Sequence, residues 1–395
     1  MKEKQNSFDE VIDRSGSLSI KWDFYEKDTL PMWVADMDFR APKPIIDAIV
    51  ARTKHGIFGY AYYPSSYYKV LIKWFKRYYN WVIQMEWLVF TPGVIIAINL
   101  AIKSFSNPGD SIIVQNPVYY PFYGTIKRNR RKVLLNPLKL VNGRYHMDFE
   151  NLEQIAKNPR TRILILCNPH NPVGRLWNKE ELTHLGDICI KNDIMIIADE
   201  IHSDLIYPGY KHTNFASINT SFAQKSITCT SASKTFNLPG LQLSNIIIPN
   251  QKIRRVFKNA LESVFIPEEH GYLPNILSIV GLQAAFEKCD DWLTSLILYL
   301  KENLEFLKSF IGENLPRIKI IEPEGTYLVW LDFREMGMDD QYLEKLLLDK
   351  AKVILEGGYK FGQGGEGFQR INIACPRSIL ENALNRIWET LKDLN

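Results

Sequence analysis

The sequence has few cysteines, no long apolar run and no large excess of either charge. Its five cysteines, at positions 167, 189, 229, 289 and 375, include no Cys-x-x-Cys pair. This argues against a disulfide framework or a zinc knuckle and is typical of a reducing compartment. No apolar stretch approaches the roughly 18 residues that cross a membrane, and the polar first residues lack the apolar segment of a secretory signal. We therefore expect a cytoplasmic protein with no membrane partner.

The charged residues give no sign of a nucleic-acid or metal partner. The chain carries 48 Lys and Arg against 44 Asp and Glu, a net charge of +4, which gives no general case for a polyanionic ligand. One cationic run, Lys127–Lys132, is accompanied by no recognisable DNA-binding module. The seven histidines show no metal-ligand spacing. We expect neither nucleic acid nor metal to bind.

The middle of the chain has the pattern of an α/β sheet. Apolar residues make up 46% of the 395 residues and charged residues 23%, as in globular proteins. Short runs rich in β-branched residues suit strands that are buried on both faces of a parallel sheet. These runs are Ser111–Gln115, Ile163–Cys167, Ile194–Ala198, Ser226–Thr230 and Asn245–Pro249. Helical patterns such as Asn178–Asn192 lie between them, so we predict a mainly parallel sheet between residues 90 and 250.

The pattern changes after residue 285, where a long amphipathic stretch precedes shorter elements. The expected helices are Asp291–Ile311, Asp340–Ala351 and Ser378–Leu394, and the expected strands are Ile318–Ile321, Tyr327–Phe333 and Gln369–Cys375. This α+β pattern predicts a second, smaller domain. We predict a large domain of residues 45–285 and a small domain of residues 1–44 and 286–395.

Polar residues follow three successive predicted strands. Asn171 comes shortly after one strand, Asp199 ends the next, and Lys234 follows the third. Open α/β sheets bind ligands at the carboxyl ends of their strands, so these three side chains are expected to meet. Each residue alone has an ordinary structural explanation: a turn, a helix cap or a solvated cation. Three in order indicate a functional site.

These residues resemble a known family, the class I/II aminotransferase group of fold-type I pyridoxal phosphate (PLP) enzymes. Asn171-Pro-Val-Gly174, then Asp199, then Ser231-Ala-Ser-Lys234 is similar to that family's ordered signature. Four further segments resemble its cystathionine β-lyase branch of carbon–sulfur (C–S) lyases: Met32–Phe39, His55–Tyr60, Asp199–His202 and Arg370–Ser378. The resemblance implies the PLP-transferase fold of type I and a homodimer with composite active sites.

The resemblance assigns the centre of a PLP site. Lys234 would form a Schiff base with the cofactor's aldehyde and later move a proton. Asp199 would keep the pyridine nitrogen protonated through a charge-assisted hydrogen bond. Tyr119 would stack on the ring, and Asn171 would bond either the cofactor's phenolic oxygen or the substrate carboxylate. His202 stands where related aminotransferases often have Tyr, as in the lyase branch.

The resemblance also assigns the phosphate and substrate contacts. The backbone N–H groups of Val94 and Ile95, at the start of a predicted helix Val94–Phe105, would face the phosphate, and the hydroxyls of Ser231 and Ser233 would add to them. Tyr60 would reach the phosphate from the other subunit. Gln242 replaces an Arg that many relatives use there.

The substrate's α-carboxylate would be bound by Arg370, because a guanidinium pairs with a carboxylate in a fork geometry. Ala35 and Asp36 belong to a segment that would close over the substrate. Arg377, nearby in the sequence, is expected to have a surface or structural role.

Three functions follow from this site. The leading hypothesis is a PLP-dependent C–S β-lyase that acts on cystathionine, cysteine or related S-conjugates and releases thiol, pyruvate and ammonia. The alternative is an aminotransferase, which shares the removal of the Cα proton but needs a keto acid as acceptor. A third hypothesis, from a different class, is a PLP-binding regulatory protein.

Overall fold

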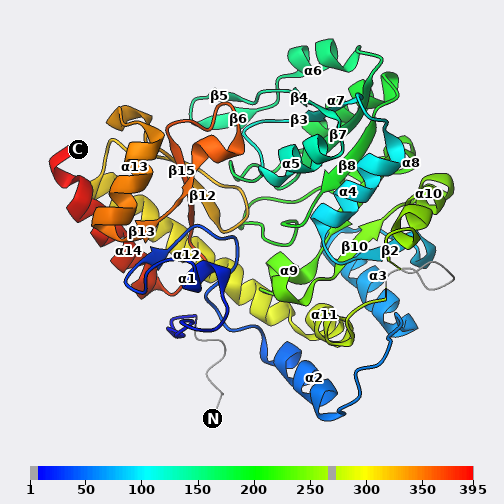
Figure 1. The fold of residues 1–395 in the computed structure, drawn as a ribbon, viewed down its shortest axis with the longest axis horizontal. Helices are drawn as coiled ribbons and strands as arrows, with labels where there is room; N and C mark the ends of the chain where they lie inside the picture. The colour runs from blue at the N-terminus through cyan, green and yellow to red at the C-terminus, as the bar shows by residue number, and fades with distance from the viewer. Residues whose placement is uncertain (1–7, 266–272, 395) are drawn as a thin grey trace.

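The computed structural model describes residues 8–265 and 273–394. A seven-stranded sheet forms the larger part of the molecule, with strand order β2-β10-β9-β8-β7-β3-β4 (Figure 1). Its strands are β2 (Leu88–Thr91), β3 (Ser111–Val114), β4 (Lys132–Leu135), β7 (Thr161–Cys167), β8 (Met195–Asp199), β9 (Ser226–Thr230) and β10 (Ser244–Ile247). Neighbouring strands from β9 to β4 are parallel, and β10 is antiparallel to both of its neighbours. The prediction of a mainly parallel sheet is confirmed.

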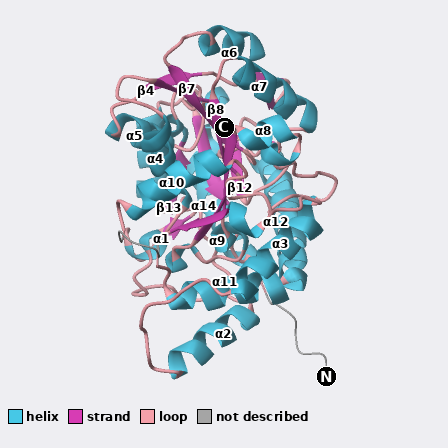
Figure 2. Ribbon diagram, turned by 90° about the vertical axis from the view of Figure 1, so that its right-hand side faces the viewer, coloured by secondary structure: helices cyan, strands magenta, loops and turns pink. Residues whose placement is uncertain are grey.

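Helices cover both faces of this sheet, and Figure 2 shows its strands enclosed between helical layers. The helices of this part are α2 (Lys43–Lys54), α3 (Ser65–Tyr79), α4 (Val94–Phe105), α5 (Pro121–Arg128), α6 (Phe149–Ala156), α7 (Lys179–Lys191), α8 (Thr220–Gln224), α9 (Ala232–Thr235), α10 (Gln251–Glu262) and α11 (Ile276–Lys288). Successive strand residues face opposite sides. In β7, Ile163 and Ile165 pack with α4 and α10, whereas Leu164 and Leu166 pack with α6 and α7. Both faces are therefore apolar, as the β-branched runs predict.

A second, four-stranded sheet has the order β11-β12-β15-β14 and is antiparallel. Its strands are β11 (Lys319–Ile321), β12 (Leu328–Asp332), β14 (Glu356–Gly357) and β15 (Phe368–Asn372), and its helices are α12 (Asp290–Asn314), α13 (Asp340–Leu346) and α14 (Arg377–Leu391). The predicted helix Asp340–Ala351 has the observed extent, but its last turn, Leu347–Ala351, is a π-helix. The division into two domains at residues 44 and 285 stays a prediction.

The N-terminal segment joins this second part. After the short helix α1 (Ile20–Asp23), strand β1 (Leu30–Pro31) pairs in parallel with β13 (Val353–Ile354). A separate hairpin is made by β5 (Lys139–Val141) and β6 (Arg144–His146). The β1–β13 pair joins the N-terminal segment to the C-terminal part of the chain.

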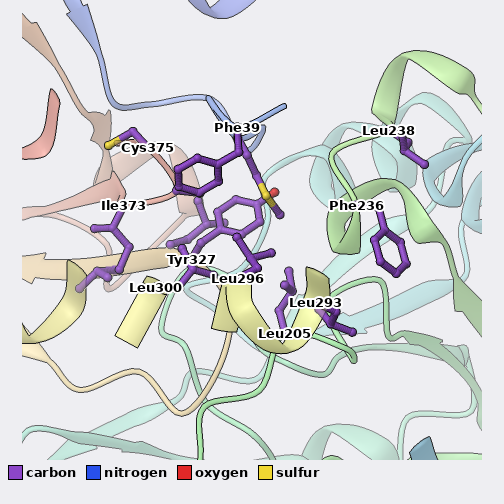
Figure 3. Close-up of a cluster of buried hydrophobic side chains, with 14 of the residues drawn as sticks. Phe39, Leu205, Phe236, Leu238, Leu293, Leu296, Leu300, Tyr327, Ile373 and Cys375 are labelled. Atoms are coloured by element: carbon purple, nitrogen blue, oxygen red, sulfur yellow. The ribbon is translucent and has the colours of Figure 1, made fainter. Parts of the chain in front are cut away.

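Helix α12 contributes to an apolar core that it shares with the N-terminal segment, α9 and the second sheet. Its Leu293, Leu296 and Leu300 are buried in a cluster with Phe39 from the N-terminal segment and Phe236 beside α9 (Figure 3). Full burial of one such side chain contributes about 1.5–3 kcal/mol relative to exposure. This shared core holds the N-terminal segment and α9 in place. No helix among the described residues combines the length and the apolar character needed to span a membrane.

Candidate active site

A cavity of about 320 Å³ lies at the carboxyl ends of β7, β8 and β9. The adjacent, parallel order of these strands brings the segments that follow them to one edge of the sheet. Eight residues that the sequence predicts for the site line this cavity: Ala35, Val94, Ile95, Tyr119, Asn171, Asp199, His202 and Lys234. The structure thus brings together the three residues that follow successive strands.

Lys234 and Asp199 are buried and electrostatically unusual. Burial, with Arg370 adding a smaller repulsion, lowers the pKa of Lys234 to about 8 despite the nearby carboxylates of Asp36 and Asp199. Burial likewise raises the pKa of Asp199 to about 7, and the only described donor to its carboxylate is the backbone N–H of Ile201, at 3.1 Å. An amine of this pKa is partly neutral near pH 7, so it can act as a nucleophile and as a base.

His202 lies three residues after Asp199, in the loop that follows β8, and is uncharged. Burial, reinforced by the positive charges of Lys234 and Arg370, lowers the pKa of the His202 imidazole to about 3. Its Nδ1 has no hydrogen-bond partner among the residues that the structure describes. A buried polar atom without a partner is costly, so this atom is available to a bound group.

Arg370 adjoins the cavity through Asn171. Its Nη1 donates to Asn171 Oδ1 at 3.0 Å and its Nη2 donates to the Trp33 carbonyl at 2.7 Å. The carboxylate of Glu356 lies 3.7 Å from Nη2. Arg370 is buried on β15, and its Nε has no partner among the described residues. A fixed, buried guanidinium of this kind can receive a carboxylate.

The start of α4 forms the other end of the cavity. Gly93 precedes the helix and no side chain caps it, so the first N–H groups, including those of Val94 and Ile95, are free to face an anion. Ser231 caps α9, its hydroxyl donating to the Leu243 carbonyl at 2.8 Å and accepting from Ser233 N–H at 3.1 Å. Ser231 and Ser233 therefore stand beside the cavity rather than among the residues that line it.

Two further predicted residues lie outside the cavity. Tyr60 is 95% exposed on the loop between α2 and α3. Asp36 points into an ion cluster, with Arg14 at 3.0 Å and Lys21 at 3.8 Å. Arg377 makes a structural contact, in line with the role expected for it: its Nε donates to Asn303 Oδ1 at 2.8 Å.

Some residues of the site could not be found from the sequence. Tyr327 donates its hydroxyl to the Ala35 carbonyl at 2.9 Å, and Lys234 Nζ donates to the same oxygen at 2.6 Å. Asn372, at the end of β15, donates to the carbonyls of Val34 and Asp36. These residues hold the N-terminal segment over the cavity. Cys167, a buried residue at the end of β7, also lines the cavity, and burial raises the pKa of its thiol.

The chemistry of these residues fits PLP. The cavity offers an amine of lowered pKa for the aldehyde, a buried carboxylate with room for another donor, and uncapped N–H groups for the phosphate. Tyr119, whose pKa burial raises to about 12, provides a neutral ring at the wall. The volume of the cavity is in the range of small-molecule sites.

Asp199 is expected to make the stability of the cofactor-free protein depend on pH. Because burial raises its pKa from 3.8 to about 7, the folded chain binds this proton more tightly than the unfolded chain does. Its contribution to stability is full below pH 3.8 and is lost as the pH rises through 7, with a slope of at most about 1.4 kcal/mol per pH unit. Urea unfolding from pH 5 to 8 should show this decline, and Asp199→Asn should flatten it. An equal slope in both proteins would contradict the raised pKa.

Comparison with known proteins agrees with this fold. The model of the family "Aminotransferase class I and II" matches residues 29–387. Cystathionine beta-lyase PatB of Bacillus subtilis is 43% identical over 98% of this chain and 100% of that protein. Cystalysin from Treponema denticola, whose crystal structure contains pyridoxal 5'-phosphate, superposes with a TM-score of 0.95 at 39% identity, covering 99% of this chain and 100% of that chain. The PLP-bound C–S lyase from Staphylococcus hominis gives 0.91 at 34% identity, covering 98% of each.

The mainly parallel sheet, with the site at its carboxyl edge, defines an α/β protein of the PLP-transferase type. The chain belongs to the aminotransferase class I and II family, whose model spans nearly all of it.

Proposed function

We propose that this chain is a PLP-dependent C–S β-lyase that acts on cystathionine or related cysteine S-conjugates. The observation that carries the proposal is the presence of Lys234 and Asp199 in one cavity, with the uncapped start of α4 lining the same cavity. The 43% identity to a cystathionine beta-lyase supports the lyase reaction rather than another reaction of the family. The similarity to the structures of cystalysin and of the C–S lyase from Staphylococcus hominis supports it as well.

When bound, PLP supplies an electron-poor ring that accepts the electron pair left by the departing Cα proton. Lys234 Nζ would hold the cofactor through its aldehyde, and the same amine would remove the substrate's Cα proton. Its lowered pKa suits both steps, because a base works best with a pKa near the operating pH. Asp199 holds the proton on the ring nitrogen, and a cationic partner there lowers its raised pKa.

Other residues orient the reactants. Arg370 would bind the α-carboxylate, and Asn171, already hydrogen-bonded to Arg370 at 3.0 Å, would bond either that carboxylate or the cofactor's phenolic oxygen. Tyr119 would stack on the ring, and the N–H groups of Val94 and Ile95 would bind the phosphate with Ser231 and Ser233. Neutral His202 lines the same cavity as Asp199. Ala35 and Asp36 cover the substrate from the N-terminal segment. Loss of the β-thiolate leaves an enamine that hydrolyses to pyruvate and ammonia.

The oligomer and the location are part of the same proposal. Tyr60 is almost fully exposed in the single chain, next to Ile57, Phe58 and Tyr62, which are also exposed. A second copy that covers these side chains would bring Tyr60 to its phosphate site, which is the homodimer with composite sites expected from the sequence. A cytoplasmic location is supported by five free cysteines, all buried.

Incubation of the purified protein with cystathionine and PLP, without any keto acid, is the test of the proposed function. A β-lyase needs only a leaving group on Cβ, so we expect free thiol and pyruvate in equal amounts, measured with a thiol reagent and lactate dehydrogenase. A parallel reaction with alanine and a keto acid measures transamination. Amino transfer without thiol release would contradict the lyase and favour the aminotransferase, which shares the family model.

A further inference from the structure

A second carboxylate lies behind the cavity, and the proposed reaction does not use it. Asp204 is five residues after Asp199 and partly buried, and burial raises the pKa of its carboxyl group. Three side chains donate to it: Thr235 Oγ1 at 2.7 Å, Trp74 Nε1 at 3.0 Å, and the Tyr79 hydroxyl. Two of these donors come from α3, whereas Thr235 directly follows Lys234.

The loop that carries Asp199 and His202 is held on its other side as well. Glu200 is fully buried. Its carboxylate accepts from Asn214 Nδ2 at 2.6 Å and from Phe215 N–H at 2.8 Å. The loop is therefore fixed at both ends by carboxylates, Glu200 at the start and Asp204 at the end. Of these two anchors, Asp204 is the one bonded to the helix that carries Lys234.

That helix needs such an anchor. Helix α9 comprises only Ala232–Thr235, and a single turn has almost no stability of its own because nucleation is unfavourable. Its first turn is fixed by the Ser231 hydroxyl, which caps Ser233 N–H. At its last residue the hydroxyl of Thr235, which is fully buried, donates to Asp204.

We propose that Asp204 is a positioning residue which, through Thr235, fixes the Lys234 amine relative to Asp199 and His202. The inference rests on the proposed function, because it assigns to Lys234 the proton transfer at the substrate's Cα. A displacement of about 1 Å in a group that transfers a proton can reduce the rate on the order of 100-fold. Asp204 does not line the cavity and therefore acts through Thr235 rather than on the substrate.

The test compares three variants of the PLP-loaded enzyme. Thr235→Val keeps the shape of the side chain and removes its donor, Thr235→Ser keeps the donor, and Tyr79→Phe removes a different donor from the same carboxylate. We expect Thr235→Val to lower kcat for cystathionine cleavage by about 10- to 100-fold with little change in KM, and Thr235→Ser to restore it. Tyr79→Phe should lower the melting temperature without changing kcat.

A spectroscopic measurement separates positioning from stability. The pH at which the visible PLP–lysine band titrates reports the surroundings of Lys234, which include the charges of Asp36, Arg370 and Asp199. Thr235→Val changes none of these three charged residues, so a shifted titration midpoint of the band in this variant reports a displaced Lys234 amine. The midpoint in Tyr79→Phe should equal that of the wild type. If Thr235→Val does not fold, Thr235→Ala repeats the measurement.

Two results would overturn the inference. One is an unchanged kcat and band midpoint in Thr235→Val, with only a lower melting temperature. The other is an equal fall of kcat in Tyr79→Phe, which would make Asp204 a general structural anchor. A wild-type protein that gains no visible band with PLP contradicts the proposed function itself, so the two failures are distinguishable.

Discussion

Replacement of Lys234 by alanine is expected to abolish the visible PLP band and to lower the rate of cystathionine cleavage by about 100- to 10,000-fold. The expected loss is this large because one amine, on helix α9 just after β9, would both bond the cofactor and transfer the proton. Its surroundings give no substitute: the other cation beside the cavity, Arg370, is bonded to Asn171 and Trp33. Absorbance after PLP addition and single-turnover pyruvate formation measure the two losses.

The same variant tests the regulatory alternative. The alanine side chain removes an ammonium that donates to the Ala35 carbonyl, which keeps its bond to Tyr327, so the fold is expected to persist. A biological effect that survives in Lys234→Ala while the band and the lyase activity vanish would make binding, and not catalysis, the essential role. Retention of the band in a folded Lys234→Ala protein would refute the assignment of Lys234.

Arg370→Lys is expected to raise KM for amino-acid substrates by about 10- to 150-fold, with the visible PLP band unchanged. Lysine retains the charge beside Glu356, which lies 3.7 Å from the guanidinium, but it cannot offer the planar fork that pairs with a carboxylate. A hydrogen bond to a charged group contributes about 1.5–3 kcal/mol, which corresponds to this range of affinity. Steady-state kinetics with cystathionine measures the change.

Arg377→Lys is the matched control. Arg377, at the start of α14, is only seven residues after Arg370, but it donates to Asn303 and its guanidinium lies 4.6 Å from the centre of the Phe306 ring. Its replacement should lower the melting temperature and leave KM unchanged. An increase of KM in Arg377→Lys equal to that in Arg370→Lys would show that the arginine at position 370 is not specific for the carboxylate.

The large sheet and the centre of the site could be predicted because their signals are local. The helix Val94–Phe105 has the predicted bounds, and the runs that end in Cys167 and Thr230 are strands with those same last residues. Once β7, β8 and β9 are parallel neighbours, their ends must meet, so Asn171, Asp199 and Lys234 lie together by topology alone.

The remaining features depend on contacts that no local pattern encodes. The apolar run at β10 does not reveal its direction, and it is antiparallel to both neighbours. The ion pairs of Asp36 with Arg14 and Lys21 are set by the path of the N-terminal segment, and its expected place over the substrate stays a prediction. Tyr327 and the pair of Asp204 with Thr235 become visible only when distant segments are side by side.

The contacts that hold the N-terminal segment against distant parts of the chain also affect how the protein folds during its synthesis. Trp33 and Arg370, which are hydrogen-bonded at 2.7 Å, are 337 residues apart in the chain, and β1 finds its partner only in β13. At about 5–20 residues per second, a ribosome needs roughly 20 to 70 seconds to make that interval. The wall of the cavity made by Ala35 therefore forms late, and such non-local pairing is slow to fold. The nascent chain passes through a long stage in which its first strand has no partner.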